Sequence, residues 1–166
     1  MFPPDTQNLA RKIIEAYAAQ DKRIVSAESC TGGLIGAALT EISGSSAVVE
    51  RGFITYSNDA KIEVLGIMPE TLEEFGAVSG EVAEAMAQGA LEFSRADAAV
   101  STTGIAGPTG GTSNKPVGLV YIGIATRDGV NFHVKNEFKG DREAVRAQTL
   151  REAFKLLLSL VEKEPD

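Results

Sequence analysis

The sequence lacks the features that would place a chain outside the cell or within a membrane. It has one cysteine in 166 residues, so no disulfide can form within the chain. Its first residues, Met1-Phe2-Pro3-Pro4-Asp5, have neither the basic start nor the apolar core of a signal peptide. No apolar stretch approaches the roughly 20 residues that a membrane-spanning helix needs. These absences predict a cytoplasmic protein with no membrane partner.

Positive charge is also scarce. The chain has 16 Lys and Arg residues against 23 Asp and Glu residues, which gives a net charge of −7. Attraction to nucleic acid comes from clustered Lys and Arg that displace counterions, so we expect no nucleic-acid partner. A local cationic pocket for one phosphate is still compatible with this charge, because the net charge describes the whole surface.

Histidine is limited to His133. Apolar residues on its predicted strand share one face, which puts His133 on the other face, toward solvent. We therefore expect no catalytic histidine. No group of His, Cys, Asp and Glu has the spacing of a metal site either, so the sequence predicts no metal and no cofactor.

The composition, with 43% hydrophobic and 23% charged residues, is typical of a globular protein, and the length predicts one domain over residues 1–166. Apolar periodicity and capping residues alternate helices with strands. Helices are predicted over 7–20, 34–42 and 60–65, after Ser79 and after Asp141, and strands over 24–25, 48–57, 98–101, 117–126 and 130–138. Asp128-Gly129 predicts a hairpin between the last two strands. The predicted fold class is α/β, a three-layer α/β/α domain on a mostly parallel mixed sheet with an antiparallel strand near the C-terminus.

The run from Ser29 to Gly33 joins a predicted strand to a predicted helix. Ser29 then lies at the carboxyl end of the sheet, where open α/β folds bind ligands, and is a candidate nucleophile. The free amides of the helix start are candidates for holding an oxyanion or a phosphate, and Gly32 and Gly33 would let a substrate approach the backbone. On the local pattern alone, the same run is more typical of a turn whose hydroxyls cap a helix.

A serine nucleophile needs a base, and two candidates follow the second predicted strand. Lys61 qualifies if burial lowers its pKa, and Tyr56 lies five residues earlier, so both could point into one cleft. A surface lysine and an interface tyrosine are the plainer alternatives. Cys30 is a further candidate nucleophile, but no histidine or cationic partner is evident for it, which favours a small buried residue.

A glycine-rich loop, 104–118, separates two predicted strands and is long enough to be a binding loop. It lacks the Gly-Lys-Ser/Thr ending of a phosphate-binding Walker loop, so ATP binding has little support. Arg142, at the start of the last predicted helix, is a candidate for a substrate phosphate, although a solvated arginine is the plainer interpretation.

Four motifs resemble the CinA C-terminal domain family in their order and spacing. They are Ala27-Glu28-Ser29-Cys30-Thr31-Gly32-Gly33, Tyr56-Ser57-Asn58-Asp59-Ala60-Lys61, Thr103-Gly104-Ile105-Ala106-Gly107-Pro108-Thr109-Gly110-Gly111 and Lys115-Pro116-Val117-Gly118. The resemblance covers nearly the whole chain. It implies hydrolysis of nicotinamide mononucleotide to nicotinic acid mononucleotide and ammonia, a step of pyridine nucleotide salvage.

The resemblance also implies roles for individual residues. It makes Ser29 the nucleophile, with Tyr56 and Lys61 as activating partners, and it places Thr103 and Gly104 in the substrate pocket. Cys30, Thr31, Gly32 and Gly33 are expected to contact the substrate beside Ser29, and a homodimer is expected from base rates. Two other functions stay open: a nucleotide-binding or regulatory module without turnover, and an amidase for another small amide.

Overall fold

The computed structural model describes residues 1–162; residues 163–166, at the end of the expected domain, lie outside the described part. The elements are α1 (Pro4–Ala19), β1 (Ile24–Glu28), α2 (Leu34–Thr40), a 3-10 turn (Ser45–Ala47), β2 (Val49–Ile54), α3 (Asn58–Leu65), α4 (Pro69–Phe75), α5 (Gly80–Glu92), β3 (Ala98–Gly104), β4 (Leu119–Thr126), β5 (Asn131–Glu137) and α6 (Arg142–Ser159). The strands form one sheet in the order β2-β1-β3-β4-β5. β1 pairs in parallel with β2 and β3, whereas β4 is antiparallel to both β3 and β5. The predicted fold class is confirmed.

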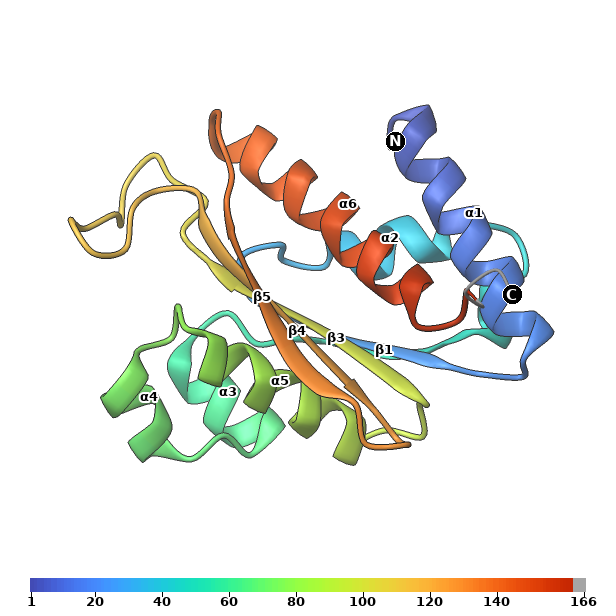
Figure 1. Ribbon diagram of the computed structural model, residues 1–166, viewed down its shortest axis with the longest axis horizontal. Helices are drawn as coiled ribbons and strands as arrows, with labels where there is room; N and C mark the ends of the chain where they lie inside the picture. Colours follow the sequence, from blue (N-terminus) through green and yellow to red (C-terminus); the bar gives the residue numbers. More distant parts are fainter. Residues whose placement is uncertain (163–166) are drawn as a thin grey trace.

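Helices cover both faces of the sheet (Figure 1). α1, α2 and α6 pack on one face, around a core that includes Tyr17, Ile122 and Phe154. α3, α4 and α5 cover the other face, around Val25, Leu65 and Met86. Within residues 1–162, no helix combines the length and the apolar character needed to cross a membrane.

The burial pattern of a strand reflects its place in the sheet. Every residue of β1 is buried, because helices cover this central strand on both sides. β5 alternates exposed and half-buried residues, as expected of an edge strand with one covered face. The hairpin predicted at Asp128-Gly129 joins β4 to β5, and Gly129 has the positive φ of 102° that such a turn favours.

Several boundaries differ from the prediction for local reasons. α1 begins at Pro4 because proline is well suited to the first turn of a helix. The cap of α3 is Ser57, whose hydroxyl accepts from the Ala60 amide, so α3 begins at Asn58, two residues before the predicted start at 60. α4 was not predicted, because Leu72 is its only buried residue and gives no periodic pattern.

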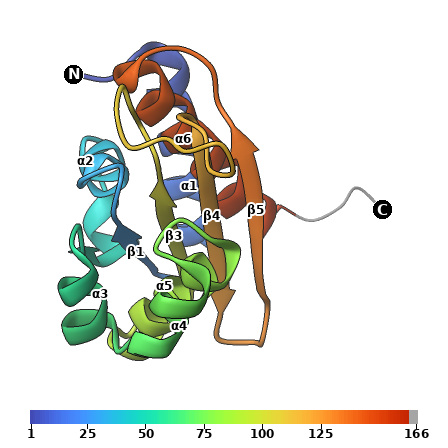
Figure 2. The same ribbon diagram turned by 90° about the vertical axis from the view of Figure 1, so that its left-hand side faces the viewer.

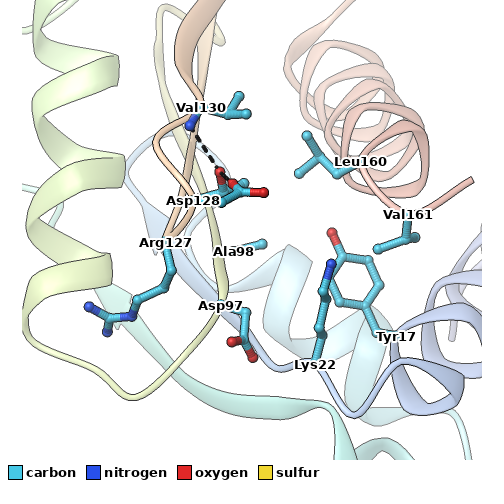
Figure 3. Close-up of a pocket in the computed structure, with 10 residues that line it drawn as sticks. Tyr17, Lys22, Asp97, Ala98, Arg127, Asp128, Val130, Leu160 and Val161 are labelled. Atoms are coloured by element: carbon cyan, nitrogen blue, oxygen red, sulfur yellow. Dashed lines mark hydrogen bonds between the residues drawn. The ribbon is translucent and has the colours of Figure 1, made fainter.

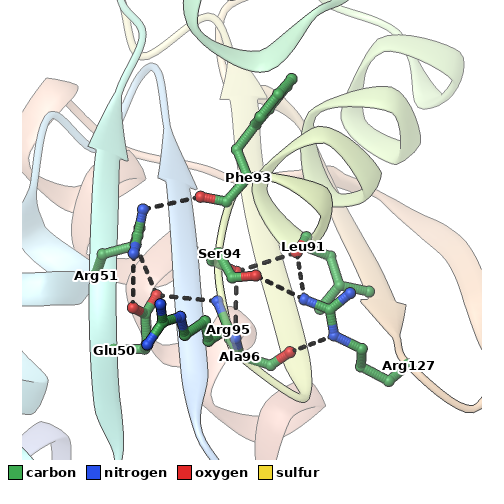
Figure 4. Close-up of polar contacts among 8 residues, drawn as sticks. All are labelled: Glu50, Arg51, Leu91, Phe93, Ser94, Arg95, Ala96 and Arg127. Atoms are coloured by element: carbon green, nitrogen blue, oxygen red, sulfur yellow. Dashed lines mark hydrogen bonds and ion pairs between the residues drawn. The ribbon is translucent and has the colours of Figure 1, made fainter.

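A polar network fastens the carboxyl end of α5 to neighbouring strands (Figure 4). The Arg127 guanidinium donates to the backbone carbonyls of Leu91, Ser94 and Ala96 at 2.7 to 2.9 Å. Arg51, on β2, donates to the carbonyl of Phe93. These arginines satisfy carbonyls that have no partner inside the helix, so they fix the connection from α5 to β3.

Candidate active site

A tight turn carries Ser29 from β1 into α2. Ser29 directly follows the end of β1, and its amide donates to the Thr102 carbonyl at 3.0 Å. Gly32 and Gly33 then take φ values of 58° and 101°, in the left-handed region that favours glycine. The two glycines are therefore needed for the course of the backbone, and Ser29 lies at the carboxyl end of the sheet, as predicted.

Lys61 reaches Ser29 from α3. Its Nζ lies 3.1 Å from Ser29 Oγ, 3.1 Å from the Thr55 carbonyl oxygen and 3.3 Å from the Tyr56 carbonyl oxygen. The residue is only 1% exposed, and no carboxylate within residues 1–162 pairs with its amine. Burial lowers the pKa of Lys61, because the charged ammonium loses its hydration, and this outweighs an opposing effect of Cys30.

The partners of Lys61 determine where a neutral amine would direct its lone pair. A neutral amine has two hydrogens, and backbone carbonyls can only accept. If those hydrogens go to Thr55 O and Tyr56 O, the lone pair faces Ser29 Oγ. The arrangement can therefore remove the Ser29 proton.

Tyr56 and Arg142 meet at the mouth of the same site. Tyr56 is 61% exposed, and its hydroxyl accepts from Arg142 Nη2 at 3.2 Å. Arg142 Nη1 donates to the Gly107 carbonyl at 2.9 Å, which ties α6 to the glycine-rich loop. Figure 2 shows this loop beside the beginning of α6. Tyr56 contacts Lys61 through its backbone carbonyl, and the hydrogen-bond partner of its hydroxyl in the described structure is Arg142 rather than Ser29.

Cys30 is buried next to Ser29 and has the properties of an inert thiol. It is 7% exposed, and its pKa is raised to about 11, chiefly by burial. The nearby charge of Glu28 raises the pKa further, while contacts with Thr102 and Arg146 act in the opposite direction. A thiol with this pKa is protonated near neutral pH, so it is a poor nucleophile.

These side chains surround a cavity of about 340 Å³, a size typical of small-molecule sites. Its lining is Ser29, Cys30, Tyr56, Asn58, Lys61, Ala77, Gly104, Ile105, Ala106, Gly107, Thr109, Gly110 and Arg142. Four predicted contact residues, Thr31, Gly32, Gly33 and Thr103, do not line it. The Thr103 hydroxyl turns away and donates to the Ala77 carbonyl at 2.6 Å. Thr31 is fully buried beneath the turn.

Sequence reasoning missed Glu28, the residue before Ser29. Its carboxylate is 1% exposed and accepts from the amides of Gly33, Ile35 and Gly36 at 2.9 to 3.1 Å. The start of α2 is thus occupied by the chain itself, contrary to the expectation that its amides are free for a substrate. The Gly32 amide donates to the Ser29 carbonyl. Among residues 29–36, only the amides of Cys30 and Thr31 have no acceptor in the described structure.

A second cavity, of about 190 Å³, lies at the opposite end of the sheet (Figure 3). Tyr17 and Asp97 line it, but the Tyr17 hydroxyl already donates to the Leu157 carbonyl and Asp97 already accepts from the Arg23 amide. It holds no serine or cysteine that would serve as a nucleophile. The cavity at Ser29 is therefore the better candidate site.

His133 lies outside the Ser29 cavity. As predicted, it is exposed to solvent on the other face of β5, and one side of its ring also packs against the start of α5. Its Nδ1 lies 2.6 Å from Glu84 Oε1, and Gly80 leaves the space that the ring fills, since a Cβ there would be 2.3 Å from it. Within the described chain, no three His, Cys, Asp or Glu side chains are grouped as metal ligands.

Residues 6–161 match the family described as the CinA C-terminal domain. The chain belongs to this family. The family resemblance inferred from the four motifs is thereby confirmed, and the match extends over all the elements that form the site.

Individual relatives agree with this assignment. Nicotinamide-nucleotide amidohydrolase PncC of Enterobacter agglomerans is 54% identical over 140 residues, which cover 84% of this chain and 85% of the relative. The protein of the same name in Escherichia coli K12 is 46% identical, with 95% of each chain covered. The crystal structure of competence/damage inducible protein CihA from Agrobacterium tumefaciens has a TM-score of 0.96 and 50% identity, and covers 98% of this chain and 99% of that one.

Other relatives are much longer. One in Caldicellulosiruptor saccharolyticus, named as competence-damage inducible, is 52% identical over 153 residues. The match covers 92% of this chain but 37% of that relative. The similarity to these longer proteins is therefore limited to the CinA C-terminal domain.

Proposed function

We propose that the chain hydrolyses the carboxamide of nicotinamide mononucleotide to nicotinic acid mononucleotide and ammonia, in pyridine nucleotide salvage. The observation that carries the proposal is the buried contact of 3.1 Å between Lys61 Nζ and Ser29 Oγ at the wall of a cavity. The names of two relatives support the substrate, since both are nicotinamide-nucleotide amidohydrolases.

In the proposed mechanism, neutral Lys61 takes the Ser29 hydroxyl proton as Oγ attacks the carboxamide carbon. Collapse of the tetrahedral intermediate breaks the carbon–nitrogen bond, and the proton on Lys61 goes to the leaving nitrogen, which departs as ammonia. A water molecule then attacks the acyl-enzyme, with Lys61 again taking the proton. As the bond to Oγ breaks, Lys61 passes this proton to Ser29 Oγ, and the carboxylic acid is released with Ser29 and neutral Lys61 restored. Tyr56 would line the substrate pocket without acting as the base.

The proposed oxyanion site is the amide of Cys30, the residue after Ser29, which lines the cavity. The amide that follows a nucleophile commonly serves this purpose at a strand-to-helix turn. The Cys30 amide has no acceptor within residues 1–162, whereas the amides at the start of α2 donate to the Glu28 carboxylate. The Glu28 contacts thus support an oxyanion site before α2 rather than at its first turn.

Ammonia release from purified protein tests the proposal. We expect release from nicotinamide mononucleotide and much slower release from free nicotinamide, which lacks the ribose phosphate. Adding a chelator is expected to leave the rate unchanged. No release from either amide would favour a nucleotide-binding module without turnover, and equal rates would favour an amidase of broader range.

Arg142 is proposed to bind the substrate phosphate. Replacing it with methionine is expected to raise KM for the mononucleotide about 10- to 100-fold, the loss of one or two charge-assisted hydrogen bonds. Nicotinamide riboside, which has no phosphate, should react equally well with both proteins. Steady-state kinetics on the two substrates would measure this difference.

Tyr56→Phe is the matched control for Arg142. It removes the hydroxyl that accepts from Arg142 but keeps the ring and the guanidinium. If Tyr56→Phe reproduced the full rise in KM, Arg142 would act by holding Tyr56, and its assignment to the phosphate would be wrong.

A further inference from the structure

Glu28 contacts the segments that hold both proposed catalytic side chains, although it touches neither of their reactive atoms in the described contacts. Its backbone carbonyl accepts from the Thr55 amide at 2.9 Å, and the Thr55 carbonyl in turn accepts from Lys61 Nζ at 3.1 Å. Its side chain binds the far end of the Ser29 turn, through the Gly33 amide and through Thr31. One residue therefore connects the support of Lys61 to the support of Ser29.

The hydroxyl contacts around Glu28 have a defined direction. Thr31 Oγ1 donates to Glu28 Oε2 at 2.7 Å, and this uses its single hydrogen. Thr31 Oγ1 also lies 2.7 Å from Thr102 Oγ1, so Thr102 must be the donor in that pair. The chain of hydrogen bonds runs from Thr102 on β3 through Thr31 to Glu28 at the end of β1.

Thr102 also holds the backbone of the nucleophile, because its carbonyl accepts from the Ser29 amide at 3.0 Å. Thus Thr102 of β3 binds the turn at two points, Ser29 and Thr31, and the Glu28 carboxylate binds it at Thr31 and Gly33. Glu28, Thr31 and Thr102 are each at most 1% exposed, so water does not compete for these hydrogen bonds. Each hydroxyl hydrogen of this buried network has one acceptor, so the network is satisfied by one arrangement of the turn.

We propose that Glu28 and Thr31 are positioning residues, which fix the Ser29 turn so that Oγ faces Lys61 and the Cys30 amide stays available to the oxyanion. This inference rests on the proposed function. It predicts that loss of the network slows the attack by Ser29 without weakening substrate binding, because the cavity lining from Gly104 to Gly110 and Arg142 is separate from it.

Thr31→Val tests the proposal, since valine keeps the shape and removes the hydroxyl. We expect kcat to fall about 10-fold or more with KM within twofold of the parent value, and Thr31→Ser, which restores the hydroxyl, to regain most of the rate. Thr149→Val is the matched control: Thr149 is also fully buried, and its hydroxyl donates only to the Val145 carbonyl within α6. It should leave kcat unchanged.

The rate of labelling by a fluorophosphonate, a serine-directed probe, gives a second readout that needs no mononucleotide. Slower labelling of Thr31→Val than of Thr31→Ser, in proteins with similar melting temperatures, supports the positioning role. Equal kcat and equal labelling in these two variants overturns it, even if the parent protein deamidates the mononucleotide. A parent protein that neither releases ammonia nor reacts with the probe overturns the proposed function itself.

Discussion

Ser29→Ala is expected to lower kcat for ammonia release about 10,000-fold or more, a loss typical of removing a nucleophile that acts as a unit with its base. Cys30→Ala should keep kcat within a few fold. The two side chains are adjacent, but only Ser29 has a base at 3.1 Å, whereas the Cys30 thiol has a pKa of about 11 and is protonated near neutral pH. The measurement is steady-state ammonia release by both variants at saturating substrate.

The Cys30 variant also controls for damage to the turn. Cys30 is almost fully buried, so its truncation leaves a small cavity and lowers the melting temperature slightly, whereas Ser29→Ala removes one oxygen atom. A pair in which Ser29→Ala retained the rate and Cys30→Ala lost it would reverse the assignment of the nucleophile.

The sequence was most informative about the fold where local signals and burial agree. The Asp128-Gly129 hairpin and the small-residue strand beginning at Ala98 were predicted correctly, because turn chemistry and strand propensity are local properties. α4 was not predicted because a helix whose only buried residue is Leu72 has no apolar periodicity. Similarly, His133 was placed on the correct side of β5, but its packing against Gly80 depends on the length of a distant helix.

The sequence predicted several residues of the site but not the contacts between them. The spacing in the sequence predicted that Tyr56 and Lys61 lie near Ser29 and that either could be the base. The choice between them depends on which of their atoms are in contact, and spacing does not give this. Lys61 meets the carbonyl of Tyr56, and the phenol meets Arg142, 86 residues further along the chain. Glu28 was overlooked for the same reason: a carboxylate at the end of a strand gives no sign, in sequence, of the five donors around it.

Lys61→Met is expected to lower kcat/KM by about 100- to 10,000-fold, the usual contribution of a general base. In the parent protein, activity should rise with pH as Lys61 loses its proton and reach a plateau above its pKa, which burial holds below 10.5. The methionine variant should lose this rising limb. Lys12→Met, which changes an exposed lysine of α1, is the control and should keep both the rate and the pH profile. An unchanged limb in Lys61→Met would assign the base to another group.

The same lysine makes stability depend on pH in a direction that can be worked out. Because the pKa of Lys61 is lower in the folded state than in the unfolded chain, the unfolded state binds more protons between those two values, and the free energy of unfolding rises with pH across that window. At pH values below both pKa values, the buried ammonium of Lys61 destabilises the folded protein to the full extent. At pH values above both, the amine is neutral and this destabilisation is absent. Lys61→Met carries no such cost, so its stability relative to the parent should be most favourable below the folded-state pKa of Lys61 and should decline between that pKa and 10.5. Urea unfolding of both proteins across this range measures the trend, and a difference that stays constant with pH would mean that Lys61 is fully charged in the folded protein, a state in which it cannot accept the Ser29 proton.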